Sequence, residues 1–188
     1  RNEILLQELQ EQEEQLLDPD ISETAMRHGD YPTLIGCSDT LAEERLLIRQ
    51  IQETLRDGVK AGEIAVLTRR YSEMMSLKAV LQRAGIAAHI VQETNGETPE
   101  GVAVCTLHSA KGLEYRVVFI TNLDAMFDTD GLRRKEGLND FEANELRLLY
   151  VGMTRARDKL NMTYRTRLPR QIVPLKAFLD AVARRATG

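Results

Sequence analysis

Apolar residues along this chain follow two different periods, which predict where strands and helices lie. Short unbroken apolar runs of strand length alternate with longer segments in which apolar residues recur every three or four positions. The predicted strands are Pro32–Cys37, Ile64–Leu67, Ile86–Val91, Gly101–Thr106, Val117–Thr121 and Lys159–Thr163. The predicted helices are residues 1–17, a segment capped by Ser38, Asp39 or Thr40 that stops near Asp57, then Glu73–Arg83 with Ser72 as its cap, Glu142–Arg155 and Pro174–Arg185.

This order of elements predicts an α/β fold. A strand without polar residues, such as Ile64–Leu67, is typical of a parallel sheet that is covered on both faces. Strands that alternate with helices are joined by right-handed crossovers. We therefore expect a mainly parallel sheet flanked by helices, in a single domain that spans residues 1–188, with a charged loop at Asp128–Asp140.

Composition and cysteine usage narrow the class of protein. With 43% hydrophobic residues the chain can bury a substantial core. None of its apolar runs approaches the roughly 18 residues that a membrane helix needs, so we predict a cytoplasmic protein without a membrane partner. Cys37 and Cys105 each lie in a strand-like run, which favours buried reduced thiols over a disulfide. Neither cysteine has the neighbours that a metal site needs, so no metal site is predicted.

The net charge of −4 is unevenly distributed. Residues 1–23 hold eight acidic residues and one basic residue, whereas residues 147–185 hold ten basic and two acidic residues. The basic C-terminal third suggests contact with a polyanion that is confined to one region. A solvated basic face would give the same count, so both interpretations remain open at this point.

The segment Thr106–Glu114 (TLHSAKGLE) is a first candidate for ligand contact. It leaves a buried strand and turns through small residues, and its hydroxyl, imidazole and ammonium groups suit contacts with phosphate or ribose. Gly112 permits close approach of a ligand to the backbone. In the plainer alternative, Lys111 and Glu114 form a surface ion pair and His108 is an ordinary loop histidine.

The segment Glu145–Arg157 is a second candidate. It is predicted to be a helix that ends in Thr154 and Arg155, and such an arginine can supply a delocalised cation to a phosphoryl group in its transition state. A basic helix end that interacts with the helix dipole is the plainer alternative. Because parallel sheets bind ligands at the carboxyl ends of their strands, we expect both the loop after Thr106 and the loop before Lys159 to lie there.

Three segments resemble motifs of one known family. TLHSAKGLEYRVVFI resembles motif V of UvrD/Rep-type superfamily 1 DNA helicases, ELRLLYVGMTRARDKL resembles their motif VI, and IAVLTRRYSEMMSLKAVLQRAGI resembles their motif IVa region. These segments follow in the family's order and together cover Ile64–Thr163. The resemblance implies a C-terminal RecA-like (2A) domain, with the motif IVa region at residues 64–91, motif V at 106–114 and motif VI at 145–157.

The resemblance also implies roles for single residues. Arg155 is similar to the arginine finger that reaches the γ-phosphate of ATP bound on an N-terminal RecA-like (1A) domain of the same polypeptide. Glu114 is expected to contact the nucleotide ribose, with Gly112 shaping its loop. The residues expected to contact single-stranded DNA are Arg69, Thr106, His108 and Lys111.

The chain departs from the family in several places. Thr68 stands where an aromatic residue is usual, and Leu146 stands where an arginine is expected. Only about ten residues separate Val91 from Val102, where the family carries its long 2B insertion, so we expect 2B to be absent. The sequence contains no G-x-x-x-x-G-K-S/T phosphate loop (Walker A). ATP with Mg²⁺ is therefore expected to be held mainly by the 1A domain, and this part alone is expected to be inactive.

These expectations describe the motor domain of an ATP-dependent DNA helicase or translocase that works at the nucleoid. Two alternatives stay open. The same motifs would occur in a helicase-nuclease or in a regulatory UvrD-like ATPase that does not unwind processively. The other alternative is an interaction module that kept the fold but lost catalysis, although such a module would not need Arg155 and Glu114.

Overall fold

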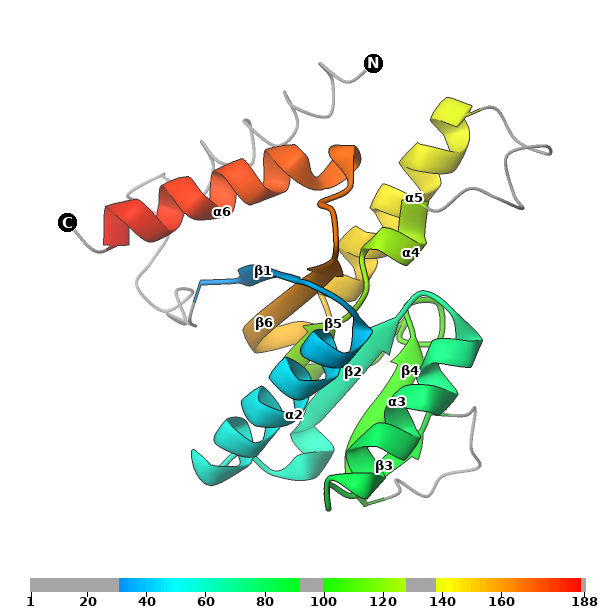
Figure 1. Ribbon diagram of the computed structural model, residues 1–188, viewed down its shortest axis with the longest axis vertical. Helices are drawn as coiled ribbons and strands as arrows, with labels where there is room; N and C mark the ends of the chain where they lie inside the picture. Colours follow the sequence, from blue (N-terminus) through cyan, green and yellow to red (C-terminus); the bar gives the residue numbers. More distant parts are fainter. Residues whose placement is uncertain (1–30, 92–99, 128–137, 187–188) are drawn as a thin grey trace.

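The computed structural model describes residues 31–91, 100–127 and 138–186, which form one sheet with helices on both faces (Figure 1). All strand pairs are parallel, in the order β1-β6-β5-β2-β4-β3. The strands are β1 Thr33–Cys37, β2 Ile64–Thr68, β3 Ala88–Ile90, β4 Val102–Thr106, β5 Tyr115–Ile120 and β6 Ala156–Arg165. The helices are α2 Thr40–Arg56, α3 Tyr71–Arg83, α4 Asp124–Phe127, α5 Leu138–Met153 and α6 Val173–Ala186, with 3-10 turns at Ala61–Glu63 and Arg170–Ile172.

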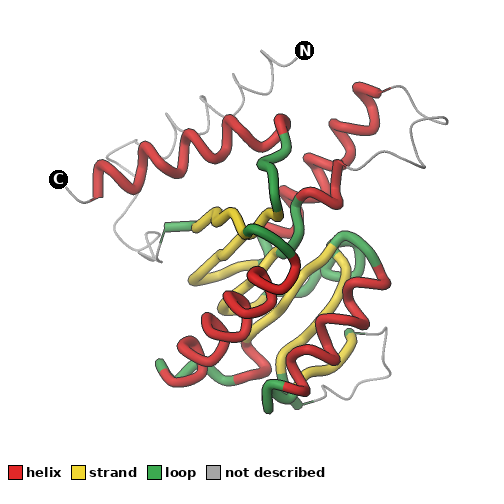
Figure 2. Tube along the Cα trace, in the orientation of Figure 1, coloured by secondary structure: helices red, strands yellow, loops and turns green. Residues whose placement is uncertain are grey.

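The predicted mainly parallel α/β fold is confirmed. Strand β2 is buried along its whole length, as expected for a central strand covered on both faces. Helices α2 and α3 lie over one face of the sheet (Figures 1 and 2), where Leu47, Ile51 and Leu81 pack against the strands. Leu149 of α5 and Leu179 of α6 belong to the core on the other face.

Several element boundaries differ from the predicted ones. Strand β6 has ten residues instead of five, because its first half pairs with β5 and its second half pairs with β1. Helix α3 begins at Tyr71, so Ser72 is not its cap, and Arg70 in the cap position makes no side-chain capping bond. Asp39 does cap α2, and its carboxylate accepts a hydrogen bond from the backbone N–H of Ala42 at 2.8 Å.

Other differences lie around α5. The short helix α4 was not predicted, and α5 begins at Leu138 and ends at Met153 rather than running from Glu142 to Arg155. The predicted helix at residues 1–17 and most of the predicted loop at 128–140 lie outside the described residues. So does most of the short link where a 2B insertion would lie, at residues 92–99.

Both cysteines are free thiols. Cys105 is fully buried, whereas Cys37 is only half-buried, so the expectation of burial is wrong for Cys37. Three strands separate β1 from β4 in the sheet, which places the two residues roughly 19 Å apart at about 4.8 Å per strand. A disulfide between them is excluded, because it requires Cα atoms within about 7 Å.

No helix in the part of the chain that the structure describes is long and apolar enough to span a bilayer. Within the same residues, no three His, Cys, Asp or Glu side chains are grouped so that they could hold a metal ion.

Candidate functional site

The segment after β4 is anchored by its apolar residues and presents its polar ones. Leu107 and Ala110 are fully buried, whereas His108, Lys111 and Glu114 are exposed. The backbone N–H of Leu107 extends the sheet pattern by donating to Thr68 O at 2.9 Å, and that of Ala110 donates to Thr106 O at 3.1 Å. The buried residues and these backbone hydrogen bonds therefore anchor the segment that carries the exposed polar side chains.

Hydrogen bonds fix the start of this segment, and a glycine allows the turn near its end. The hydroxyls of Thr106 and Ser109 are 2.8 Å apart, and the Ser109 N–H donates to Thr106 Oγ1 at 3.2 Å. Gly112 has a φ of +83°, in the left-handed region that glycine adopts without steric cost. Within the described residues Lys111 and Glu114 form no ion pair, so the plainer reading of these two residues has no support.

Arg155 lies at the opposite end of the same segment and contacts it directly. Its Nε donates to Val151 O at 3.0 Å, its Nη1 to Leu113 O at 3.2 Å and its Nη2 to Thr154 Oγ1 at 3.0 Å. Its carbonyl oxygen accepts a hydrogen bond from the Tyr115 N–H at 2.8 Å. The helix end that carries Arg155 is therefore joined to the residues beside Glu114.

The expectation that both candidate segments lie at carboxyl ends of strands is wrong for the second one. Tyr115 and Ala156 are paired at the starts of β5 and β6, so Arg155 lies at the amino ends of these strands. The physical reason is that α5 runs back across the sheet before the chain enters β6. Thr106 does end β4, and it pairs with Thr68 at the carboxyl end of β2.

The fold therefore separates the predicted residues into two groups. Gly112, Glu114 and Arg155 lie near the amino ends of β5 and β6, whereas Arg69 and Thr106 lie at the carboxyl ends of β2 and β4. The two groups lie at opposite ends of the strands, roughly 20 Å apart, because β5 has six residues at about 3.3 Å per residue. The segment 107–114 crosses the sheet between them, with His108 near one end and Glu114 at the other.

Arg69 forms a bidentate ion pair with Glu145 of α5. Its Nε lies 2.7 Å from Glu145 Oε2 and its Nη2 lies 2.9 Å from Glu145 Oε1. The Glu145 side chain is 6% exposed and that of Arg69 is 21% exposed. A phosphate that approached Arg69 would compete with a carboxylate that already neutralises its charge.

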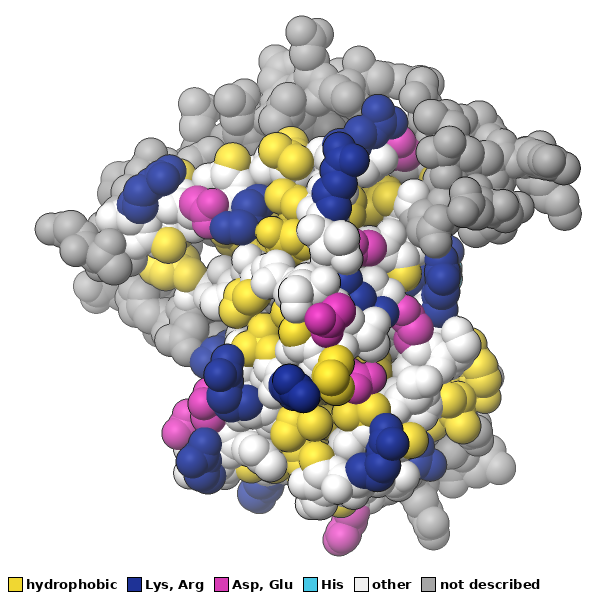
Figure 3. Space-filling model, in the orientation of Figure 1, with side chains coloured by type: hydrophobic (Ala, Val, Ile, Leu, Met, Phe, Trp, Pro, Cys, Tyr) yellow, Lys and Arg dark blue, Asp and Glu magenta, His cyan; other side chains and the backbone are white. Residues whose placement is uncertain are grey.

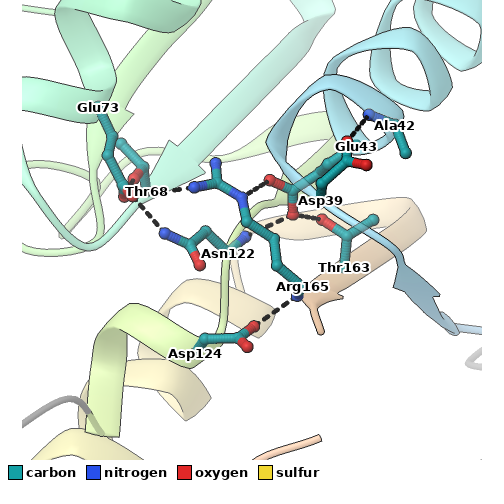
Figure 4. Close-up of polar contacts among 9 residues, drawn as sticks. All are labelled: Asp39, Ala42, Glu43, Thr68, Glu73, Asn122, Asp124, Thr163 and Arg165. Atoms are coloured by element: carbon teal, nitrogen blue, oxygen red, sulfur yellow. Dashed lines mark hydrogen bonds and ion pairs between the residues drawn. The ribbon is translucent and has the colours of Figure 1, made fainter. Parts of the chain in front are cut away.

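A buried carboxylate cluster at the carboxyl ends of β2, β5 and β6 was not predicted (Figure 4). Its centre is Glu43 of α2, which is 1% exposed. Glu43 Oε1 accepts from the Asn122 N–H at 2.8 Å and from the Thr163 hydroxyl, and Oε2 accepts from Arg165 Nε at 2.6 Å. Glu43 shares a helical stripe with the buried Leu47 and Ile51, and this position among apolar residues is the signal that sequence reasoning missed.

Glu73 of α3 extends the cluster on its other side (Figure 4). Its carboxylate accepts from the Thr68 hydroxyl at 2.7 Å and from the Asn122 side-chain amide, and it lies 3.6 Å from Arg165 Nη1. The chain leaves β2 toward α3 on one face and leaves β5 toward α4 on the other. Such a switch point is where open α/β sheets bind ligands, and here Glu73 and Arg165 of the cluster line a surface pocket.

Charged side chains on the face covered by α2 and α3 do not gather into one basic patch. Figure 3 shows Lys and Arg side chains scattered among acidic and apolar ones over this face. Within the described residues, arginines that form ion pairs with carboxylates include Arg69, Arg116, Arg165 and Arg170. Arg165 and Arg170 belong to the basic segment 147–185, whose contact with a polyanion stays a prediction.

Comparison with known proteins identifies related sequences and related solved structures. Residues 93–167 match the UvrD-like helicase C-terminal domain family. A probable DNA helicase II homolog of Mycoplasma capricolum is 35% identical over 128 residues, which are 65% of this chain and 17% of that protein. DNA helicase II of Escherichia coli is 37% identical over 108 residues, which are 54% of this chain and 14% of that protein.

Two further comparisons extend over more of the chain. The ATP-dependent DNA helicase PcrA of Staphylococcus aureus is 29% identical over 163 residues, or 86% of this chain and 21% of that protein. The chain thus spans about a fifth or less of these relatives. The crystal structure of the C-terminal domain of a possible DNA helicase from Lactobacillus plantarum has the same fold, with a TM-score of 0.62, 20% identity, and coverage of 81% of this chain and 85% of that one. The match at residues 93–167 and the relatives confirm the resemblance drawn from the motifs, and this chain carries a UvrD-like helicase C-terminal domain.

Proposed function

We propose that this chain is the C-terminal motor domain of an ATP-dependent DNA helicase or translocase. In this proposal it completes an ATP site whose phosphate loop belongs to an N-terminal 1A domain of the same polypeptide, and it contacts single-stranded DNA. The family match supports the class of protein. The proposed role in ATP hydrolysis is supported by the contacts of the Arg155 guanidinium, which donates to uncharged acceptors.

Arg155 is oriented by uncharged acceptors. The guanidinium has five N–H donors, and three of them point to two carbonyl oxygens and one hydroxyl. Within the described residues no carboxylate forms an ion pair with it, in contrast to Arg69 and Arg165. Arg155 therefore keeps its positive charge and two donors for an anion from another domain, which is what an arginine finger needs.

The neighbouring residues suit the nucleotide end of such a site. Glu114 is exposed and directly follows Leu113, whose carbonyl oxygen binds Arg155. Ribose hydroxyls can donate to a carboxylate at this position, and Gly112 leaves space for close approach, because a Cβ built there would meet nothing within 4 Å. Mg²⁺ would be held with the ATP phosphates mainly by the 1A domain.

Contact with single-stranded DNA would involve the carboxyl end of β4. Thr106, His108 and Lys111 offer a hydroxyl, an imidazole and an ammonium group, and Arg69 would have to exchange Glu145 for a phosphate. Side chains of this kind contact mainly the sugar-phosphate backbone of DNA. Such binding tolerates different base sequences and weakens as the salt concentration rises. Closure of the cleft between the two RecA-like domains would then couple ATP binding to movement along DNA.

The test is DNA-stimulated ATP hydrolysis by the complete protein that carries this chain. Arg155→Ala should lower kcat on the order of 1,000-fold, because an arginine finger stabilises the transition-state charge. Arg157→Ala is the matched control, since Arg157 is an exposed arginine two residues further on, and it should retain nearly full activity. Near-normal turnover by Arg155→Ala would refute the proposed site. Residues 1–188 alone should show no ATPase activity above background.

A further inference from the structure

We propose that Thr154 is a positioning residue for Arg155, which rests on the proposed function of Arg155 as the finger. The Thr154 hydroxyl contacts both the end of α5 and the guanidinium. It donates to Val151 O at 2.8 Å and accepts from Arg155 Nη2 at 3.0 Å. Because a hydroxyl has one proton, the bond to Val151 turns the oxygen lone pairs toward the cation.

Three separate acceptors then define the plane of the guanidinium. Val151 O receives Nε at 3.0 Å, Thr154 Oγ1 receives Nη2 at 3.0 Å, and Leu113 O receives Nη1 at 3.2 Å. Val151 O is one of the last carbonyl oxygens of α5, where the helix dipole is negative and favours a cation. A planar group bound at three nitrogens has one orientation, and none of the three acceptors cancels its charge.

The contribution of Thr154 is orientation rather than charge. Loss of its hydroxyl leaves Arg155 with two of its three acceptors and frees Nη2. The side chain can then sample conformations that do not face an incoming phosphate, and misplacement of a catalytic group lowers the rate without removing the group. We therefore expect a loss in turnover that is much smaller than the loss from Arg155→Ala.

A purely structural role for Thr154 makes a different prediction. Threonine hydroxyls often bond to a carbonyl oxygen three residues earlier at helix ends, and such a bond would stabilise α5 whether or not Arg155 is present. In that case the effects of Thr154 and Arg155 substitutions would add. If the hydroxyl acts through Arg155, removing it from a protein that already lacks Arg155 should change nothing further.

The experiment is a double-mutant cycle in the complete protein, with DNA-stimulated ATPase as the readout. Thr154→Val should lower kcat about 10-fold, the loss expected for one hydrogen bond to a charged group, and leave the KM for ATP within about 2-fold. Thr154→Ser, which restores the hydroxyl, should return kcat to near the wild-type value. Thr154→Val combined with Arg155→Ala should have the same kcat as Arg155→Ala alone. Thermal unfolding of each variant checks the fold, and Thr154→Ala replaces Thr154→Val if the valine variant does not fold.

The outcomes separate this inference from the proposed function. Wild-type turnover by Thr154→Val, together with a large loss in Arg155→Ala, overturns the role of Thr154 and keeps the finger. An additional loss from Thr154→Val in the Arg155→Ala background, or a failure of Thr154→Ser to recover, overturns it in favour of a structural role. Normal turnover by Arg155→Ala contradicts the proposed function itself.

Discussion

The carbonyl oxygen of Leu113 accepts a hydrogen bond from Nη1 of Arg155 at 3.2 Å, although the two residues are 42 positions apart in the sequence. This bond joins the end of motif V to the end of motif VI. One residue after Leu113 comes Glu114, the proposed ribose contact. The same segment begins at Thr106, at the carboxyl end of β4. A displacement of the segment would therefore move residues at both proposed ligand sites.

Gly152 is required for the close approach of α5 to this segment. A Cβ built on Gly152 would lie 2.3 Å from Leu107 Cδ2, with Ile120 Cδ1 and Leu67 Cδ1 at 3.5 and 3.7 Å. Because Leu107 is fully buried, it has little room to move. Gly152→Ala should lower the free energy of unfolding by about 1–3 kcal/mol, the usual cost of overpacking, as measured by urea denaturation. Gly62→Ala is the control, since a Cβ there meets nothing within 4 Å; equal stability of both variants would contradict the prediction.

Glu43 should contribute more to stability than any other acidic residue of α2. Glu43→Gln keeps the size of the side chain but removes the charge that faces Arg165 and places an amide N–H₂ among donors. Removing one partner of a buried pair typically costs about 3 kcal/mol or more. Urea denaturation should show this loss for Glu43→Gln, while the neighbouring and more exposed Glu44→Gln should stay within about 0.5 kcal/mol of the wild type. A loss of that small size for Glu43→Gln as well would show that the cluster adds no net stability.

Stability should fall at alkaline pH through Cys105. Burial raises the pKa of this thiol to about 12, from an ordinary value of 9.0. Between these two values the unfolded thiol ionises while the native thiol stays neutral, so the free energy of unfolding decreases as pH rises from 9 toward 12. From pH 8 to pH 10 the loss due to Cys105 should be about 1 kcal/mol.

Cys105→Ala isolates this effect. Burial also raises the pKa of Tyr115 to about 12, but Tyr115 is present in both proteins, so its contribution largely cancels in the comparison. Urea denaturation at pH 8 and pH 10 should show a smaller decrease for the variant than for the wild type. The same decrease in both proteins would mean that the Cys105 thiol ionises in the native state as readily as in the unfolded one.

Lys111 should affect DNA affinity through phosphate contact. Lys111→Ala should weaken binding of single-stranded DNA by the complete protein and reduce the slope of log Kd against log salt by about 0.7, the value for one phosphate contact to a single strand. Fluorescence anisotropy with a labelled oligonucleotide at several salt concentrations measures both quantities. Lys60→Ala is the control, because Lys60 is an exposed lysine that lies between α2 and β2. An unchanged slope for Lys111→Ala would remove this residue from the DNA contact.

The sequence determined most of the element order, because the two hydrophobic periods are local properties. Every one of the six predicted strands within the described residues is present. Local sequence patterns predict the ends of the helices and strands less accurately. Ser72 looks like a helix cap in isolation, but α3 starts earlier, so that Glu73 in its first turn reaches Thr68 and Asn122.

The motifs around Thr106 and Arg155 could likewise be read from the sequence, since each is a continuous run of residues. They lie at opposite ends of the strands, because Thr106 ends β4 whereas Arg155 precedes β6. The tertiary structure decided this by pairing β4, β2, β5 and β6 in parallel, which depends on packing between distant segments. Glu43 shows the same limit, as its partners Asn122, Thr163 and Arg165 lie 79 to 122 residues further along the chain. A buried charge is stable only where such partners converge, and no local pattern records where the chain brings them together.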